Sequence, residues 1–532
     1  MMDNIQQQIA KLLADPEQLL QTKPYYRTIS YNSSSPNGGS SSPNGGVIES
    51  VGTKVRATIP KFKRKPIPIE QLLKEYDPWS HSVLHDENIP SITMKSTEGG
   101  WIQIEQKRMP IPYQQNIAKK QTLHLCNNPM NHILLNPEPT ELQKLYFIKI
   151  KQAWDERNID GLKTEAVLTQ KSQSVVGMLF YHNYAGEIKA RILKYSDGFS
   201  LITHKDNNGE HIMECVYYMI DDTEYLDCYD NTFMYRFVNS LDIDNNTGAE
   251  TVNGWRLIES GYHGFSECPL IVKRGAVAWD AVQDLIELYE RTYNTFMVIQ
   301  NRHGNGALYI KGKLNQLGQK LAGSIVLFDN SLDPNADAKY LTPPSPQNMI
   351  ETLDQLEYSI QKGSGTTFIL PKDIKLSGDT SGIAVQLTQE LDIETALQDV
   401  NDWQNFANKM MRLFKQGLAR ELVSKGEKGY ENAITEFEQL NIRTRFVVWR
   451  PQSNEAYNQM LTTLHGAGGI SNQTLVEKNT ESCPDEMARI RNEEEMAIQK
   501  QIKQQELTMR ISEKAVNTNN TSNDKLNGET NS

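Results

Sequence analysis

The feature that most constrains this fold is a long, uninterrupted helical pattern, IAVQLTQELDIETALQDVNDWQNFANKMMRLFKQGLARELVS, which begins at Ile383. As a single helix of about 40 residues it would be roughly 60 Å long, at about 1.5 Å per residue. That length exceeds what an ordinary globular core needs, and several other polar amphipathic helices are predicted in the same chain. Helices of this kind need neighbours to cover their apolar faces, so the pattern favours an assembly of subunits.

The rest of the chain alternates between helix and strand patterns, which predicts an α+β fold. Residues 174–270 contain several short strand patterns separated by turn residues. Residues 276–300 have apolar residues at the spacing of one helix face. A further helix is predicted over 141–158, and a strand over 442–449 that ends before Pro451.

A second amphipathic helix is predicted after PPSPQ, where Ser345 suits the N-cap position and Pro346 the first helical position. Its apolar stripe consists of Met349, Leu353, Leu356 and Ile360. We expect this stripe to be exposed on the subunit and to mediate contacts between copies of the chain.

The C-terminal part contains a glycine cluster that we expect to end a helix. Gly466, Gly468 and Gly469 follow a helical pattern and permit positive φ angles. Ser471 can cap a short helix after them, and Pro484 begins a long polar helix.

Length and composition set further limits. A chain of 532 residues should form more than one structural unit, because single cores stop growing near about 250–300 residues. It has no apolar run of about 18 residues, so no membrane span is predicted, and its N-terminus lacks the apolar core of a signal peptide. The five cysteines are widely spaced without a CxxC pair, which indicates a reducing compartment and no disulfide framework.

Two segments have compositions that cannot form a core. Residues 33–46 contain SSSPNGG twice in direct tandem, and residues 511–532 are rich in Asn, Ser and Thr. Both are predicted to be disordered because they contain almost no large apolar residues.

The net charge of −11 argues against a protein that grips nucleic acid over a broad basic face. One dense basic patch interrupts the acidic background, and its cations are Lys54, Arg56, Lys61, Lys63, Arg64 and Lys65. Two interpretations stay open here. The patch is either a solvated strand and loop, or a contact with DNA or an acidic partner.

Motifs for nucleotide or calcium chemistry are incomplete. GALYIKGKL resembles a phosphate-binding loop, but its glycine spacing is one residue too long and Leu314 occupies the position of the Mg²⁺-binding Ser or Thr. DIDNNTGAE resembles a calcium loop, but Thr247 replaces the turn glycine and Asn253 the closing glutamate. We therefore predict no catalytic residue and no cofactor.

Possible metal ligands are equally incomplete. His124 and Cys126 lie on a strand-like run and His132 follows Pro129, so the interpretation as satisfied or exposed histidines is preferred over a metal site. His81 and His85 are four residues apart but lack the HExxH pattern. No metal is predicted.

Three segments, taken in order, resemble the portal proteins of tailed bacteriophages, the siphophage-type head–tail connector family. They are HGFSECPLIVKRGAVAWDAVQDLIELYERTYN, LPKDIKLSGDTSGIAVQLTQELD and FVVWRPQSNEAYNQMLTTLHGAGGISNQTLVEKNTESCPDEMARIRNEEE. Together with the strand patterns at 174–270 and an R-x-x-I-P motif that begins at Arg56, the resemblance covers roughly residues 50–510. The long N-terminus and its tandem repeat depart from the family pattern.

The resemblance implies an α+β, mainly helical portal fold with wing, stem, clip and crown parts, assembled as a ring of typically twelve subunits around a channel. Its parts in this chain would be an N-terminal segment with the disordered Ser/Pro/Asn/Gly repeat (1–50), wing (51–275), first stem helix (276–303), clip (304–345), second stem helix (346–364), tunnel loop (365–382), a second wing part with the long helix and strand (383–452), crown (453–510) and a disordered tail (511–532).

The resemblance also implies a function. The ring would stand at one capsid vertex of the virion, after synthesis in the host cytoplasm, and double-stranded DNA would be packaged and ejected through it. The implied partners are other copies of the chain, DNA bound without sequence preference, the major capsid protein, the terminase large subunit and head–tail adaptor or neck proteins, with no membrane. The tunnel-loop residues facing DNA would be Lys372, Asp373, Lys375, Ser377 and Gly378.

The acidic composition suits such a conduit, because every phosphate-neutralising contact creates affinity that must be broken as DNA advances. Two other interpretations remain: another oligomeric virion protein such as a head–tail adaptor, and a DNA-packaging enzyme. The enzyme would need a phosphate loop or a clustered acidic metal site, and neither pattern is found in the sequence.

Overall fold

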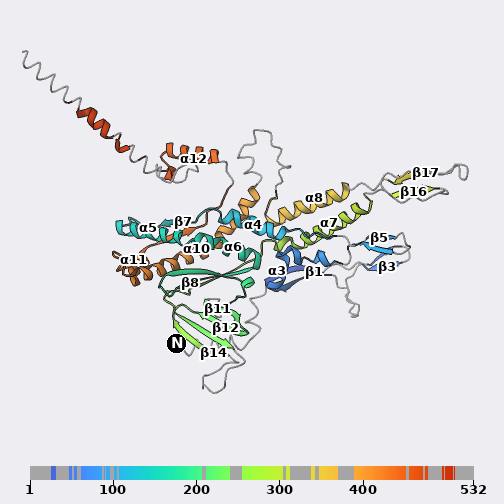
Figure 1. Ribbon diagram of the computed structural model, residues 1–532, viewed down its shortest axis with the longest axis horizontal. Coiled ribbons are helices and arrows are strands. Elements are labelled where there is room, and N and C mark those ends of the chain that lie inside the picture. The colour runs from blue at the N-terminus through green and yellow to red at the C-terminus, as the bar shows by residue number, and fades with distance from the viewer. Residues whose placement is uncertain are drawn as a thin grey trace, which may run out of the picture. The chain divides into compact units, whose positions relative to one another are not determined.

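A computed structural model shows the chain as two units, formed by residues 1–374 with 388–449 and by residues 375–387 with 450–532 (Figure 1). The structure describes residues 25–31, 47–50, 53–56, 61–86, 89, 92–95, 101–104, 107–205, 211–239, 255–303, 307–311, 337–341, 347–368, 389–450, 454–470, 474–476, 490, 494–496, 498–506 and 509. The tandem repeat at 33–46 and the tail at 511–532 lie outside these residues.

The centre of the first unit is the long helix α10 (Glu390–Ser424), which confirms the long helical pattern. Its 35 residues span about 52 Å. The helices around it are α4 (Tyr113–Cys126), α5 (Glu141–Glu156), α6 (Ile159–Gln173) and α11 (Ala433–Gln439). The core between them includes Trp154, Trp403, Phe406, Met410, Phe414 and Phe437.

The two largest antiparallel sheets of this unit confirm the strand patterns at 174–270. The five-stranded sheet has the order β10 (Ser200–Lys205), β11 (His211–Ile220), β12 (Thr223–Tyr229), β13 (Phe233–Asn239) and β14 (Trp255–Tyr262). The three-stranded sheet has the order β15 (Leu270–Arg274), β8 (Val175–His182) and β9 (Ile188–Leu193).

The three-stranded sheet lies between the helical core and the five-stranded sheet (Figure 1). Val176, Met178 and Phe180 of β8 belong to the helical core, whereas Val175 and Leu179 pack with the five-stranded sheet. Alternate residues of a strand point to opposite faces, so a strand segment buried on both faces must be apolar, as residues 175–180 of β8 are.

Helix α10 approaches the three-stranded sheet closely at Gly417. A Cβ atom at this position would lie 2.3 Å from Cδ1 of Ile188 on β9. Only glycine permits this approach, which explains a residue that is otherwise unfavourable in the interior of a helix.

One strand prediction is too long. Strand β18 (Ile442–Arg445) pairs with β7 (Asn131–Leu134) and ends four residues before the predicted boundary at 449. Arg445 pairs with Asn131, the first residue of β7, so the pairing cannot extend further along β7. The Trp449 amide instead donates to the carbonyl oxygen of His124, 2.7 Å away on α4.

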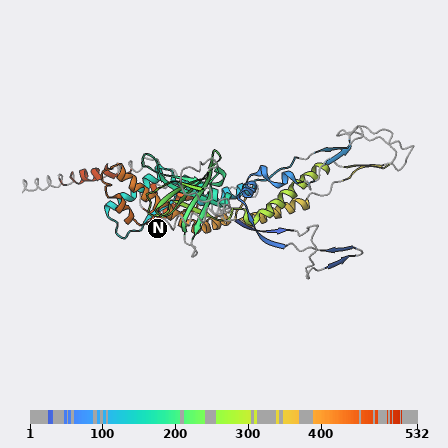
Figure 2. The ribbon, with the colours of Figure 1, turned by 90° about the horizontal axis from the view of Figure 1, so that it is seen from below.

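Two helices that are distant in the sequence pack against each other in both views (Figures 1 and 2). Helix α7 (Gln283–His303) follows a 3₁₀ turn, η4 (Asp280–Val282), and α8 (Gln347–Ser364) follows the hairpin of β16 (Ala307–Lys311) and β17 (Asp337–Leu341). Buried Trp279, Val282, Ile286 and Ile360 belong to one core cluster.

The prediction that the apolar stripe of α8 is exposed on the subunit is wrong. Leu353 and Ile360 are 7% and 0% exposed, and Leu356 is half-buried. The stripe is used within the subunit because α7 packs against it. The exposed apolar residues of α8 are Ile350 and Tyr358, which lie outside the stripe.

The N-terminal part contains short paired strands and helical turns. Strand β1 (Tyr25–Tyr31) pairs with β4 (Lys61–Ile67), β2 (Val47–Ser50) with β3 (Thr53–Arg56), and β5 (Ile92–Lys95) with β6 (Trp101–Ile104). Helix α3 (Ile69–Tyr76) and the 3₁₀ turns η1 (Pro78–Ser80) and η2 (Ser82–His85) follow β4, and η3 (Tyr195–Asp197) follows β9.

The described part of the second unit is helical. Helix α12 (Asn454–Gly466) ends in the glycine cluster, where Gly468 has a φ of 73° and the Gly469 amide donates to the Leu464 carbonyl at 2.8 Å. The predicted helix end is therefore confirmed, with a left-handed glycine closing it. Among the described residues of both units, no helix is both long and apolar enough to cross a membrane.

Candidate functional site at the base of the α8–α10 connection

The predicted DNA-facing residues lie in the connection between α8 and α10. Lys372, Asp373, Lys375, Ser377 and Gly378 fall within residues 369–388, which are outside the described residues. The structure does describe both ends of this connection, at 365–368 and from 389 onward. The geometry of these ends defines how the connection is attached to the subunit.

The first end leaves α8 through a glycine turn. Gly365 has a φ of 63°, and the Thr366 amide donates to the Gln361 carbonyl at 3.1 Å. Thr395 of α10 donates its hydroxyl to the Gly365 carbonyl at 3.0 Å. A Cβ atom at Gly365 would lie 2.3 Å from this hydroxyl oxygen, so both the backbone angle and the contact require glycine.

A lysine of α4 joins the two ends. Lys120 Nζ lies 3.1 Å from Asp392 Oδ2 and also contacts the Thr367 carbonyl oxygen. Asp392 in turn accepts the Thr367 amide at 3.0 Å through Oδ1. The Asp392 side chain is 2% exposed and that of Lys120 is 22% exposed, so this ion pair is largely shielded from water. We call Lys120, Thr367 and Asp392 the loop-base clasp.

Neighbouring polar groups extend the clasp. Gln121 donates its Nε2 to the Ser364 carbonyl at 2.8 Å and to the Thr366 hydroxyl at 3.3 Å. The Phe368 amide donates to Gln361 Oε1 at 3.1 Å, and the Phe368 ring lies 5.6 Å from that of Tyr113 on α4. The chain is thus tied to α4 and α8 as far as Phe368.

The sequence gives no local sign of the clasp. Lys120 and Thr367 are 247 residues apart, and Thr367 and Asp392 are separated by 25. A lysine in a polar helix and an aspartate in the first turn of another helix are both ordinary features of solvated surfaces. Only the packing of α4 against α10 brings them together.

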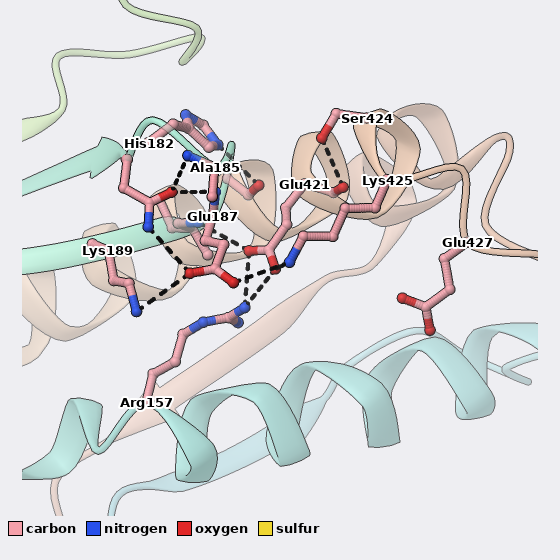
Figure 3. A network of polar contacts seen from close by, with 12 residues as sticks. Arg157, His182, Ala185, Glu187, Lys189, Glu421, Ser424, Lys425 and Glu427 are labelled. Carbon is pink, nitrogen blue, oxygen red and sulfur yellow. Dashed lines mark hydrogen bonds and ion pairs between the residues drawn. The ribbon is translucent and has the colours of Figure 1, made fainter.

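A second charged cluster holds the far end of α10, and Figure 3 shows its side chains. Glu421 accepts from Arg157 Nη2 at 2.8 Å, from the Ile188 amide at 2.9 Å and from Lys425 Nζ at 2.9 Å. Glu187 contacts the same Lys425 at 3.3 Å. The buried Glu421 carboxylate connects α10, the α5–α6 corner and the β8–β9 hairpin, so its role is to hold the unit together.

The candidate metal ligands are engaged in other contacts. His124 and Cys126 lie on α4, so the strand-like interpretation of their run is wrong; Ile117, Gln121 and Leu125 form a buried helix face there. His124 Nδ1 lies 3.2 Å from the Trp449 carbonyl oxygen. Among the described residues, no group of three potential metal ligands is found. The resemblance to a calcium loop falls on residues outside them.

Burial sets the titration of these groups. Burial lowers the pKa of His132 to about 4, and its Nδ1 lies 3.0 Å from the Thr444 hydroxyl. Burial raises the pKa of the Cys126 thiol to about 12. A neutral histidine and a protonated thiol are structural groups at neutral pH.

His81 differs from the other histidines. Its ring lies between Glu290 Oε1 of α7, at 2.7 Å, and the Glu75 carbonyl oxygen, at 2.8 Å. Burial on its own lowers the pKa of His81, but the Glu290 hydrogen bond and charge together with the Glu75 carbonyl outweigh it and raise the pKa above 6.5. Glu290 Oε1 also accepts the Ile111 amide at 2.7 Å, so this cluster fixes the start of α7 to the N-terminal part. His85 lies on η2.

Comparison with known families identifies the chain as a phage portal protein, a class of structural, non-enzymatic proteins at the portal vertex of the virion capsid. The matching family model is described as "Phage portal protein, SPP1 Gp6-like" and covers residues 103–525, so the chain belongs to this family. No curated protein matches the sequence.

The family assignment confirms the resemblance seen in the sequence and the expectation that the chain is not an enzyme. The mixed helices and strands are consistent with the portal fold. Membership implies an oligomeric ring that interacts with capsid and DNA. The interpretation as a packaging enzyme or a head–tail adaptor is not supported by this match. Residues 1–102, including β1 to β5, precede the matched region.

Proposed function

We propose that twelve copies of this chain form the ring at one capsid vertex through which double-stranded DNA is packaged and ejected. The observation that carries the proposal is the family match over residues 103–525. A ring of identical subunits needs two different contact surfaces on each copy, because each subunit meets its neighbours head to tail. Exposed Leu288 of α7 and Ile350 and Tyr358 of α8 are the apolar positions that we assign to these contacts.

The parts of the ring are assigned by their order along the chain. In this proposal α7 and α8 form the stem, and the β16–β17 hairpin belongs to the clip between them. The two sheets and α10 form the wing, and α12 begins the crown. The terminase large subunit would dock on the clip, adaptor or neck proteins would bind the same end after packaging, and the major capsid protein would surround the ring.

The connection between α8 and α10 would be the tunnel loop. A loop that contacts moving DNA must be held firmly at its base, because a functional site is only as precise as the elements that support it. The loop-base clasp supplies such support by joining both ends to α4. Lys372 and Lys375 would then contact the phosphate backbone, which steadies DNA without reading its sequence.

The assignment of the tunnel loop is tested by charge reversal. Lys372→Glu with Lys375→Glu should leave ring assembly intact and impair DNA packaging or retention in the head, because two attractive phosphate contacts become repulsive. The matched control is Lys144→Glu with Lys151→Glu, which reverses two exposed charges on α5. If the loop variant packages as much DNA as the control, these lysines do not face the channel.

A further inference from the structure

Helix α4 holds the chain of the first unit near all three places where the chain passes to or from the second unit. These crossings follow Ile374, precede Thr388 and follow Trp449. The loop-base clasp ties α4 to the chain on the outer sides of the first two crossings. A separate set of contacts ties the end of α4 to residues 448–449, just before the third crossing. Two attachments that are far apart in the sequence therefore share one helix.

The second attachment is made by the C-terminal end of α4. The Trp449 amide donates to the His124 carbonyl oxygen at 2.7 Å. His124 Nδ1 lies 3.2 Å from the Trp449 carbonyl oxygen, and the centroids of the two rings are 5.3 Å apart. Asn128, just beyond the helix, donates its Nδ2 to the Val448 carbonyl oxygen at 3.3 Å. The last four carbonyls of a helix have no partner within it, so the Trp449 amide completes the hydrogen bonding of this last turn.

The contact with Trp449 also fixes the protonation of the His124 ring. A carbonyl oxygen can only accept, so His124 Nδ1 must carry a proton. The residue is 1% exposed, and burial lowers the pKa of His124, so the ring is neutral at neutral pH. Asp392 raises and Lys120 lowers the pKa of the same ring, which means that the charges of the clasp act directly on the second attachment.

The two attachments are one helical turn apart. Lys120 and His124 are separated by four residues on α4 and therefore lie on the same face of the helix. In an α-helix the amide of residue 124 donates to the carbonyl of residue 120. A row of hydrogen bonds thus runs from the Trp449 amide through the last turn of α4 to the backbone of Lys120. The ammonium group of this lysine contacts Asp392 and the Thr367 carbonyl oxygen.

We propose that the last turn of α4 couples the two attachments, with His124 as the positioning residue that links them. Displacing residues 448–449 leaves the His124 carbonyl without its partner, loosens the last turn and moves Lys120 relative to Asp392. Opening the clasp loosens the same turn from its other side. Coupling of this kind is reciprocal, because the two equilibria shift each other by the same factor. The inference goes beyond the proposed function and does not depend on the roles given there to the α8–α10 connection or to α12.

The test is hydrogen exchange, measured by mass spectrometry on the full-length protein. The variant His124→Phe with Asn128→Ala removes the side-chain hydrogen bonds to residues 448–449 and leaves every clasp residue unchanged. The matched control is Asn136→Ala, which also removes two hydrogen bonds, both to the chain just before β18. The conservative variant His124→Asn keeps a donor near the position of Nδ1 and should exchange like wild type.

Peptides that contain Thr367 and the first turn of α10 should exchange about threefold to tenfold faster in the double variant, although no clasp residue is substituted. Peptides from the buried strand β8 should exchange at the wild-type rate. In Lys120→Met the reciprocal effect should appear at peptides that contain the Trp449 amide, with an increase of about threefold to tenfold. The control should match wild type at Thr367.

Three results would overturn the inference. Unchanged exchange at Thr367 in a double variant that exchanges faster at Trp449 would show that the attachments are independent. Faster exchange in every peptide, those of β8 included, would show a general loss of stability. An effect at Thr367 of equal size in Asn136→Ala would show that the last turn of α4 has no special part. If the double variant does not fold, Asn128→Ala alone must show the same pattern at smaller amplitude, and its absence would contradict the coupling. These readouts are independent of ring size and of DNA, so they stand apart from the tests of the proposed function.

Discussion

The loop-base clasp gives the sharpest prediction. Replacing Lys120 with Met keeps most of the aliphatic chain but removes the ammonium group. Asp392 then keeps its hydrogen bond from the Thr367 amide and loses its cation, although its side chain is only 2% exposed. The matched control is Lys119→Met, one position earlier on α4, where the side chain is exposed and donates to Gln115 Oε1 at 3.5 Å.

The expected cost lies between two limits. Removing one partner of a fully buried ion pair costs about 3–5 kcal/mol, and an exposed pair contributes about 0–1 kcal/mol. Asp392 is buried, whereas the Lys120 side chain is 22% exposed and part of its charge is screened by water. We therefore expect Lys120→Met to lower the free energy of unfolding by roughly 2–3 kcal/mol, and Lys119→Met to change it by less than about 0.5 kcal/mol.

Hydrogen exchange measured by mass spectrometry tests the local part of this prediction. Peptides that contain the Thr367 amide and the first turn of α10 should exchange at least about tenfold faster in Lys120→Met. A double-mutant cycle with Asp392→Asn should show a coupling energy above about 0.5 kcal/mol. Equal exchange in the two lysine variants, or a coupling energy near zero, would refute the clasp.

The remaining predictions concern buried charge and pH. Glu421→Gln should lower the free energy of unfolding by roughly 2–4 kcal/mol in urea denaturation, because Arg157 and Lys425 lose a buried partner, whereas half-exposed Glu427→Gln should have little effect. The pKa of His132 is about 4 when folded and 6.5 when unfolded, so stability should fall as pH decreases from 6.5 towards 4, and His132→Gln should remove this loss in pH-dependent thermal melts. The pKa of His81 is raised above 6.5, so its contribution to the free energy of unfolding is fully present below pH 6.5 and is lost as pH rises through the folded pKa. If wild type and His81→Gln lose stability equally over that upper pH range, the Glu290 contact is contradicted.

Long periodic segments were predictable from the sequence because local and tertiary preferences agree in them. The pattern after Ile383 forms α10, and the apolar alternation at 174–270 forms the strands of the two sheets. The assignment of the run around His124 to a strand is wrong because residues 122–125 alternate in polarity, whereas the deciding contacts are those of Ile117 and Leu125 with distant helices.

Which face of a helix meets another subunit could not be predicted from periodicity. The stripe of α8 was correctly located, but periodicity does not say whether Leu353 faces α7 of the same chain or another copy. The loop-base clasp could not be predicted from the sequence either, because its residues come together only in the folded chain. Lys120 and Asp392 meet only after α4 and α10 have packed, and neither residue belongs to a recognisable local motif.

Native mass spectrometry of the purified full-length protein tests the central claim most directly. A chain of 60.5 kDa that closes into a ring of twelve should give a single dominant species of about 730 kDa at micromolar concentration. Closure should also limit the distribution, so that species much larger than the ring are not populated. A protein that stays at 60.5 kDa under these conditions, or that forms an open-ended series of oligomers, would contradict the proposal that it forms a closed channel.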